Sequence, residues 1–221
     1  MDVRIAPDAA AAAEAAADWL ARRLRDAVRR RGAASLAVSG GSTPAAMFRA
    51  VAGMPVPWEH VAVWQVDERV APDGDPARNA ALLELLPPAA RVRPMPVTVR
   101  DLRAGARRYA AALPDRFDVV HLGLGDDGHT ASWPPGDPVV DSDAPVALSA
   151  EYRGHVRMTL TPAVVNASRS RLVLAAGADK AGPVAAWLLH RASLPVERVR
   201  RTGTVVVLDA AAAAALPLPP Q

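Results

Sequence analysis

The chain has 221 residues, of which 51% are hydrophobic, and its 26 basic and 23 acidic residues give a formal net charge of +3. It contains no cysteine, which excludes a disulfide framework and thiolate catalysis. No apolar run is long enough to cross a bilayer and the N-terminus lacks the basic start of a secretory signal, so a cytoplasmic protein without a membrane partner is expected.

The N-terminal quarter of the chain predicts a helix, a strand and a second helix. Residues 8–31 form an alanine-rich amphipathic pattern with Asp8 as the expected N-cap. The apolar run 35–39 predicts a buried strand, and residues 45–52 predict a helix. The basic cluster at 22–32 contains an acidic residue and no aromatic residue, which favours a solvated helix face over nucleic-acid binding.

Strand and helix patterns alternate along the rest of the chain. The expected strands lie at 61–66, 117–125, 157–161, 171–177 and 203–209. The expected helices lie at 75–86, 101–113, 162–168 and 179–190. Such alternation implies parallel pairing with both faces of the sheet covered. We therefore expect one α/β domain over residues 1–221, a three-layer, mostly parallel, Rossmann-like sheet with helices on both faces.

Four polar motifs follow expected strands, at 39–44, 67–69, 123–132 and 177–180. Ligands of open α/β sheets bind outside the carboxyl ends of the strands. The four motifs therefore predict one binding site at that edge of the sheet.

The motif SGGSTP joins a strand to a helix. Gly40 and Gly41 allow a ligand to approach the backbone, and Ser42 or Thr43 is placed to cap the helix. Exposed amides and the helix dipole then predict an anion site, although an ordinary capped turn explains the same residues equally well.

The motif DER places Asp67 and Arg69 at a strand end. The Arg69 guanidinium suits a phosphate or a carboxylate, whereas a local ion pair is the plainer interpretation.

The motif GLGDDGHTAS carries the candidate chemistry. His129 follows a strand, and imidazole, with an ordinary pKa near 6.5, suits a general base at neutral pH. Asp127 is placed to orient the ring, Gly125 and Gly128 to bring backbone amides to a ligand, and Thr130 to offer a hydroxyl. A metal site is the competing interpretation, but no other histidine has ligand spacing with His129. The strand residue His121 is expected to be a hydrogen-bonded core residue.

Lys180 is the only lysine among the 26 basic residues and stands at the expected start of a helix. A cation is poorly placed there unless an anionic ligand offsets the helix dipole. A role for Lys180 in binding an anionic ligand is therefore favoured over a surface position without function.

Read together, SGGSTP, VDER, GLGDDGHTAS, RMTLT and LAAGADK resemble the 6-phosphogluconolactonases of the glucosamine-6-phosphate deaminase and ribose-5-phosphate isomerase-like superfamily. The resemblance runs from about Ala9 to Asp209. Two positions depart from the family pattern: Trp133 and Pro134 replace an apolar pair, and Arg78 replaces a serine before Asn79. Both departures are expected to flank the pocket.

The resemblance implies hydrolysis of 6-phospho-D-glucono-1,5-lactone, with His129 as general base and Asp127 holding its ring. Gly41, Ser42, Arg69, Arg157 and Lys180 are the candidates for binding the phosphate. It implies no metal, no organic cofactor and a small-molecule sugar-phosphate lactone as partner, and we expect a monomer that binds no nucleic acid.

Two alternatives remain. A glucosamine-6-phosphate deaminase or isomerase would use a similar histidine, although a pattern resembling IAFNEP, typical of the deaminases, is absent. A non-catalytic sugar-phosphate sensor would normally carry a helix-turn-helix segment, for which the residues before the first expected strand are too few.

Overall fold

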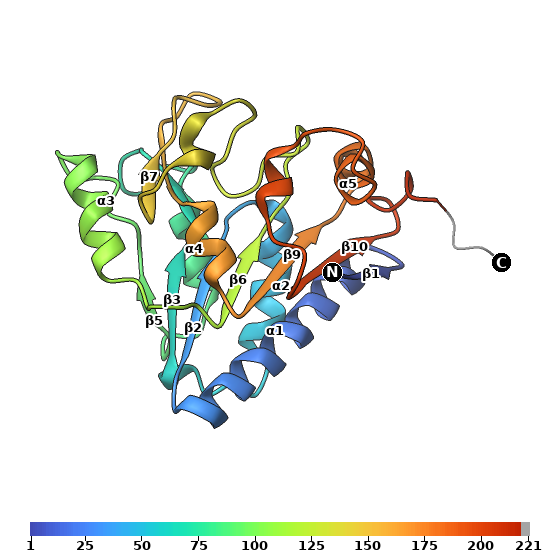
Figure 1. The fold of residues 1–221 in the computed structure, drawn as a ribbon. Helices are drawn as coiled ribbons and strands as arrows, with labels where there is room; N and C mark the ends of the chain where they lie inside the picture. The colour runs from blue at the N-terminus through green and yellow to red at the C-terminus, as the bar shows by residue number, and fades with distance from the viewer. Residues whose placement is uncertain (218–221) are drawn as a thin grey trace.

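The structure, a computed structural model, describes residues 1–217, with Ser42 described by its backbone alone. Its centre is a seven-stranded parallel sheet in the order β1-β10-β9-β6-β2-β3-β5 (Figure 1). The strands are β1 (Asp2–Ala6), β2 (Ala34–Val38), β3 (Val61–Gln65), β5 (Arg91–Arg93), β6 (Val119–Leu122), β9 (Ser170–Ala175) and β10 (Thr204–Asp209).

Helices cover both faces of this sheet, and the sheet separates the core into two clusters. On one face, α1 (Ala9–Arg31) and α2 (Ser42–Ala52) pack against the strands. On the other lie α3 (Leu102–Ala111), α4 (Pro162–Ala167) and α5 (Ala181–Leu188). Short 3-10 segments complete the layers: η1 (Trp58–His60), η2 (Asn79–Leu85), η3 (Pro138–Asp141), η4 (Ala178–Lys180) and η5 (Pro195–Arg198). The predicted three-layer α/β architecture is confirmed.

The central strands are mostly apolar and buried because both faces of the sheet are covered. All four residues of β6 and all six of β10 are buried. Helix α1 begins where the sequence predicts, since the Asp8 side chain accepts a hydrogen bond from the Ala11 amide at 2.8 Å. The helix ends at Gly32, whose φ of +76° is a left-handed conformation that glycine adopts without strain.

A second, three-stranded antiparallel sheet departs from the expected topology. It consists of β4 (Asp67–Arg69), β8 (Arg157–Leu160) and β7 (Val146–Leu148), in that order. The strand predicted at 157–161 therefore exists but lies outside the parallel sheet. Its register places Arg69 opposite Arg157. Two guanidinium groups from distant parts of the chain are thereby brought to one place.

Other differences fall on short elements. Strands β1, β5 and β7 carry no long apolar run, so the sequence pattern does not predict them. The helix expected at 75–86 is only the 3-10 segment η2, and the expected Ser42 or Thr43 cap is replaced by Gly41, the N-cap of α2. Among the described residues, no helix is long and apolar enough to pass through a bilayer.

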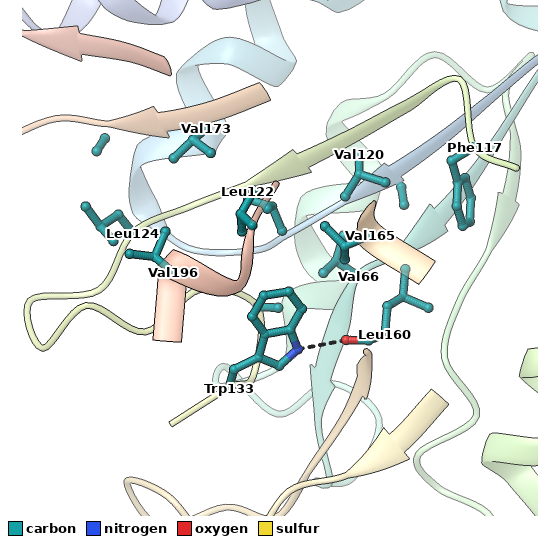
Figure 2. Packing of buried hydrophobic residues seen from close by; sticks show 14 of the residues in the cluster. Val66, Phe117, Val120, Leu122, Leu124, Trp133, Leu160, Val165, Val173 and Val196 are labelled. Carbon is teal, nitrogen blue, oxygen red and sulfur yellow. Dashed lines mark hydrogen bonds between the residues drawn. The ribbon is translucent and has the colours of Figure 1, made fainter. Parts of the chain in front are cut away.

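Trp133 fixes the loop that follows β6. Its side chain is fully buried, and its indole N–H donates to the Leu160 carbonyl at 2.8 Å (Figure 2). The indole packs among the core residues below the sheet edge. Trp133 therefore belongs to the core: it stands two residues after the cavity-lining Ala131 and does not itself line the cavity described below.

Candidate active site

A cavity of about 340 Å³ opens at the carboxyl ends of the central strands. All four polar motifs contribute to its walls. The predicted site residues that line it are Gly40, Gly41, Thr43, Asp67, Arg69, Gly125, His129, Thr130, Arg157 and Lys180. The convergence expected from parallel topology is therefore present among the described residues.

His129 and Asp127 form a hydrogen-bonded pair at this edge. The His129 Nδ1 atom lies 2.6 Å from Asp127 Oδ1, and the His129 amide donates to the same oxygen at 3.1 Å. Burial raises the pKa of the Asp127 carboxyl, but hydrogen bonds from Tyr152 and His129 outweigh burial and lower the pKa to about 2. Asp127 is therefore ionised at neutral pH.

An ionised carboxylate only accepts hydrogen bonds, so His129 Nδ1 must carry the proton in their contact. In the neutral imidazole, Nε2 then holds the free lone pair. Asp127 lies behind the ring and His129 itself lines the cavity, so a basic nitrogen is available to a bound molecule.

The close pairing of His129 with Asp127 depends on Gly125. A Cβ atom at residue 125 would lie 2.0 Å from His129 Nδ1 and 2.8 Å from Asp127 Oδ1, which no side chain tolerates. The Gly125 amide donates to the His129 carbonyl at 2.7 Å, and the Gly128 amide donates to the Gly125 carbonyl at 3.2 Å. Both amides therefore serve the loop and are not free to bind an oxyanion.

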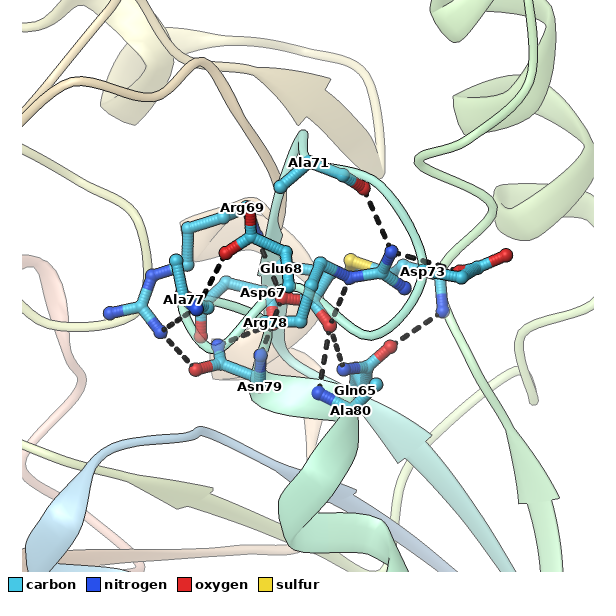
Figure 3. A network of polar contacts seen from close by, with 12 residues as sticks. Gln65, Asp67, Glu68, Arg69, Ala71, Asp73, Ala77, Arg78, Asn79 and Ala80 are labelled. Atoms are coloured by element: carbon cyan, nitrogen blue, oxygen red, sulfur yellow. Dashed lines mark hydrogen bonds and ion pairs between the residues drawn. The ribbon is translucent and has the colours of Figure 1, made fainter.

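Arg69 is held in place by a network around the buried carboxylate of Glu68 (Figure 3). Glu68 accepts hydrogen bonds from the amides of Arg69 and Asn79 at 2.8 and 2.7 Å. The Asn79 side chain in turn accepts from the Arg69 guanidinium, which also donates to the Ala77 carbonyl. The acidic residue of the DER motif that forms an ion pair is Glu68, and its partner is Arg78. Arg69 lines the cavity.

Arg78 takes part in that network from outside the cavity. Its Nε lies 3.1 Å from Glu68 Oε2, and it also contacts the Ala71 carbonyl and Asp73. Arg78 is not among the cavity-lining residues. Arg78, which departs from the family pattern, therefore stabilises the strand β4 through Glu68 and does not line the cavity.

Three further cationic residues line the cavity: Arg153, Arg157 and Lys180. The Arg157 side chain is almost fully buried, and burial, followed by the nearby Arg69, lowers the pKa of its guanidinium. Its Nε has no hydrogen-bond partner among the described residues. The Lys180 side chain is 17% exposed and lies 2.8 Å from Asp179 at the start of α5. A buried, incompletely paired guanidinium is suited to an anionic ligand.

The remaining predicted residues lie elsewhere or are already hydrogen-bonded. Gly128 does not line the cavity, because it packs against Leu194. The Thr130 hydroxyl donates to the Gly123 carbonyl at 2.7 Å, and Asp67 accepts from Ser132 at the same distance. The side chain of Ser42 lies outside the described part of the structure.

Sequence reasoning did not single out Tyr152 and Arg153. The Tyr152 hydroxyl donates to Asp127 Oδ2 at 2.5 Å, and Arg153 pairs with Asp126 at 2.5 Å. Both lie on the irregular segment between β7 and β8, where no periodic pattern or recognised motif marks them.

The carboxylates of Asp126 and Asp127 and the ring of His129 bring ligand atoms within 4.8 Å of one another. These atoms are close enough together to bind one metal ion. The spacing of histidines along the sequence does not indicate this group, because two of its three members are aspartates. Asp126 is paired with Arg153, however, and both oxygens of Asp127 accept hydrogen bonds. These contacts are those of a hydrogen-bonded dyad.

Comparison with known proteins gives concordant results. A family model described as glucosamine-6-phosphate isomerases/6-phosphogluconolactonase matches residues 7–207, a range that contains every cavity-lining residue described here. A 6-phosphogluconolactonase of Streptomyces coelicolor is 35% identical over 93% of this chain and 90% of its own length. One from Mesorhizobium japonicum is 40% identical over 70% of this chain and 71% of its own length. The crystal structure of a 6-phosphogluconolactonase from Shewanella baltica superimposes with a TM-score of 0.85, at 28% identity, over 95% of this chain and 97% of that one.

Proposed function

The chain belongs to the family of glucosamine-6-phosphate isomerases and 6-phosphogluconolactonases, and we propose that it hydrolyses 6-phospho-D-glucono-1,5-lactone with His129 as the general base. The family and the names of the relatives supply the reaction, the second step of the oxidative pentose phosphate pathway. The role of His129 rests on the observation that its Nδ1 faces an ionised Asp127 while the ring lines the cavity.

The chemistry follows from that pair. Neutral His129 accepts a proton from water through Nε2 as the water oxygen bonds to C1 of the lactone. The Asp127 carboxylate stabilises the imidazolium that forms. When the bond between C1 and the ring oxygen breaks, the imidazolium returns the proton to that oxygen, which becomes the C5 hydroxyl. The product forms as a carboxylic acid, which releases its proton to solvent and becomes 6-phosphogluconate, and His129 ends the cycle neutral.

The cations on the cavity wall supply the binding of the remote phosphate. Arg69 and Arg157 lie opposite each other on β4 and β8, and Lys180 reaches the cavity from the start of α5. Holding the phosphate at a fixed distance from the base keeps C1 in line with the activated water. Gly41, the N-cap of α2, adds the positive end of a helix dipole.

The same proposal treats the protein as a cytoplasmic monomer that requires no nucleic acid. The roles proposed for the cavity-lining residues call for no residue from a second copy of the chain. Size-exclusion chromatography with light scattering is expected to give a mass near 23.1 kDa. A larger mass would contradict the monomer.

The deciding experiment compares two substrates. With freshly prepared lactone, acid release measured at constant pH should exceed the spontaneous rate and scale with enzyme concentration. With glucosamine 6-phosphate, ammonia release should not exceed the blank. Ammonia release without lactone hydrolysis would assign the chain to the isomerase side of its family, and neither activity would favour a sensor.

A further inference from the structure

Tyr152 lies between the proposed base and the proposed phosphate-binding arginines. It belongs to the segment between β7 and β8, where its backbone forms a bridge with His155. Arg153 ties the same segment to the 123–132 loop through Asp126. A single side chain therefore contacts both halves of the site.

The hydroxyl of Tyr152 completes the hydrogen bonding of Asp127. Asp127 Oδ1 is taken by His129, and Asp127 Oδ2 accepts from the Tyr152 hydroxyl at 2.5 Å. Burial and the neighbouring Asp127 carboxylate raise the pKa of Tyr152 to about 12, so the hydroxyl remains a donor at neutral pH. With both oxygens held, the carboxylate cannot rotate away from the imidazole.

The ring of Tyr152 meets the cationic side of the cavity. The Arg157 guanidinium carbon lies 5.1 Å from the ring centroid, and that of Arg153 lies 5.2 Å from it. Arg157 has few hydrogen bonds within the described residues: its NH2 approaches the Tyr152 carbonyl at 3.4 Å, and its Nε has no hydrogen-bond partner there. The aromatic face is therefore a principal support for the Arg157 guanidinium.

We propose that Tyr152 is a positioning residue with two separable roles: its hydroxyl orients Asp127 and thereby His129, while its ring places Arg157 for the substrate phosphate. The proposal rests on the proposed function, since it assigns Tyr152 to the base and the anion site of that reaction. Removal of the hydroxyl alone then impairs the chemical step, and removal of the ring also impairs substrate binding.

Two substitutions separate these roles. Tyr152→Phe keeps the ring and is expected to lower kcat about tenfold with KM within about twofold of wild type. Tyr152→Leu removes both groups and is expected to lower kcat similarly and to raise KM about tenfold. If Tyr152→Leu melts below the assay temperature, Tyr152→Met takes its place.

The second tyrosine provides the matched control. The Tyr109 hydroxyl bonds to the backbone of Gln65 inside the core and does not line the cavity. Tyr109→Phe is expected to lower the melting temperature and leave kcat and KM unchanged. If the Tyr152 hydroxyl contributed only to folding stability, Tyr152→Phe would likewise lower the melting temperature and leave kcat and KM unchanged.

A wild-type kcat in Tyr152→Phe would overturn the hydroxyl role, and equal KM values in the two Tyr152 variants would overturn the ring role. Wild type and His129→Ala are measured alongside. If wild type hydrolyses the lactone and His129→Ala does not, these failures concern Tyr152 alone. If wild type does not hydrolyse the lactone, the proposed function itself fails.

Discussion

His121 and His129 stand eight residues apart on one segment, and their surroundings differ completely. His121 lies inside β6 with no exposed surface, edge-on to Phe48, and neither ring nitrogen has a partner among the described residues. Burial lowers the pKa of His121 to about 3. His129 lies beyond the strand end, where its side chain is 18% exposed and hydrogen-bonded to a carboxylate.

The comparison shows that position relative to the strand end decides what a histidine can do. Within the parallel sheet both faces are covered, so the His121 ring stays neutral and out of reach of a ligand. At the strand end the backbone turns at glycines, and an acidic residue two positions away orients the ring. Sequence reasoning placed both residues in the correct environments, but the expected hydrogen bond to His121 is not found among the described residues.

The largest expected effect comes from removing the base. His129→Ala is expected to lower kcat by roughly 10²–10⁴ with little change in KM, the usual loss for a general base. Steady-state kinetics on fresh lactone, corrected for spontaneous hydrolysis, measure it. His121→Leu is the paired control and should keep kcat within about twofold. Similar losses in both variants would erase the distinction between the two histidines.

A substitution of Lys180 tests whether the cationic wall of the cavity that also contains His129 binds the phosphate. Lys180→Arg keeps the charge but replaces a compact ammonium with a wide planar fork, which displaces a bound phosphate. We expect KM to rise about tenfold with a smaller drop in kcat and no change in melting temperature, since displacements of about 1 Å can cost on the order of 10²-fold.

The control for Lys180→Arg is Arg30→Lys on the exposed end of α1, which should change neither constant. A wild-type kcat/KM in Lys180→Arg would make the single lysine an accident of composition. Phosphate binding would then rest on Arg69, Arg157 and the Gly40–Gly41 turn.

His121 makes a smaller contribution, to stability as a function of pH. Because its pKa is about 3 in the folded state and near 6.5 when unfolded, the unfolded state binds more protons below pH 6.5. Stability is therefore lost as the pH falls through this range, by on the order of 1–2 kcal/mol at pH 5. Urea unfolding of wild type and His121→Leu at pH 7.5 and 5 measures the difference. An identical pH dependence in both proteins would show that His121 is not held neutral.

Chelation is expected to have no effect. If His129 and Asp127 act as a hydrogen-bonded dyad and Asp126 pairs with Arg153, dialysis against a strong chelator leaves kcat unchanged. Activity that vanished on dialysis and returned with zinc would make His129 a metal ligand.

The site residues that could be predicted from the sequence are those that follow a strand of the parallel sheet. Gly40, Arg69, His129 and Lys180 follow expected strands, and parallel pairing brings strand ends to one edge. The antiparallel pairing of β4 with β8 escaped prediction because β4 and β7 are only three residues long and carry no apolar alternation.

Side-chain contacts between distant segments were the least predictable. Tyr152 reaches Asp127 across 25 positions of the chain, and its own segment has no regular structure that would fix its direction. The motif places Trp133 next to the pocket, but it does not show that the indole N–H donates to the Leu160 carbonyl in the core. Such outcomes depend on tertiary packing, which local sequence patterns do not encode.

The central claim is that His129, and not His121, faces the reacting carbon. A crystal structure with 6-phosphogluconate bound tests it most directly. We expect the C1 carboxylate of the product to lie about 3 Å from His129 Nε2, with the phosphate against Arg69, Arg157 or Lys180 and no atom of the product in contact with His121. A product bound in the opposite direction, with its phosphate beside His129 and C1 beyond reach of any imidazole, would show that His129 is not the base.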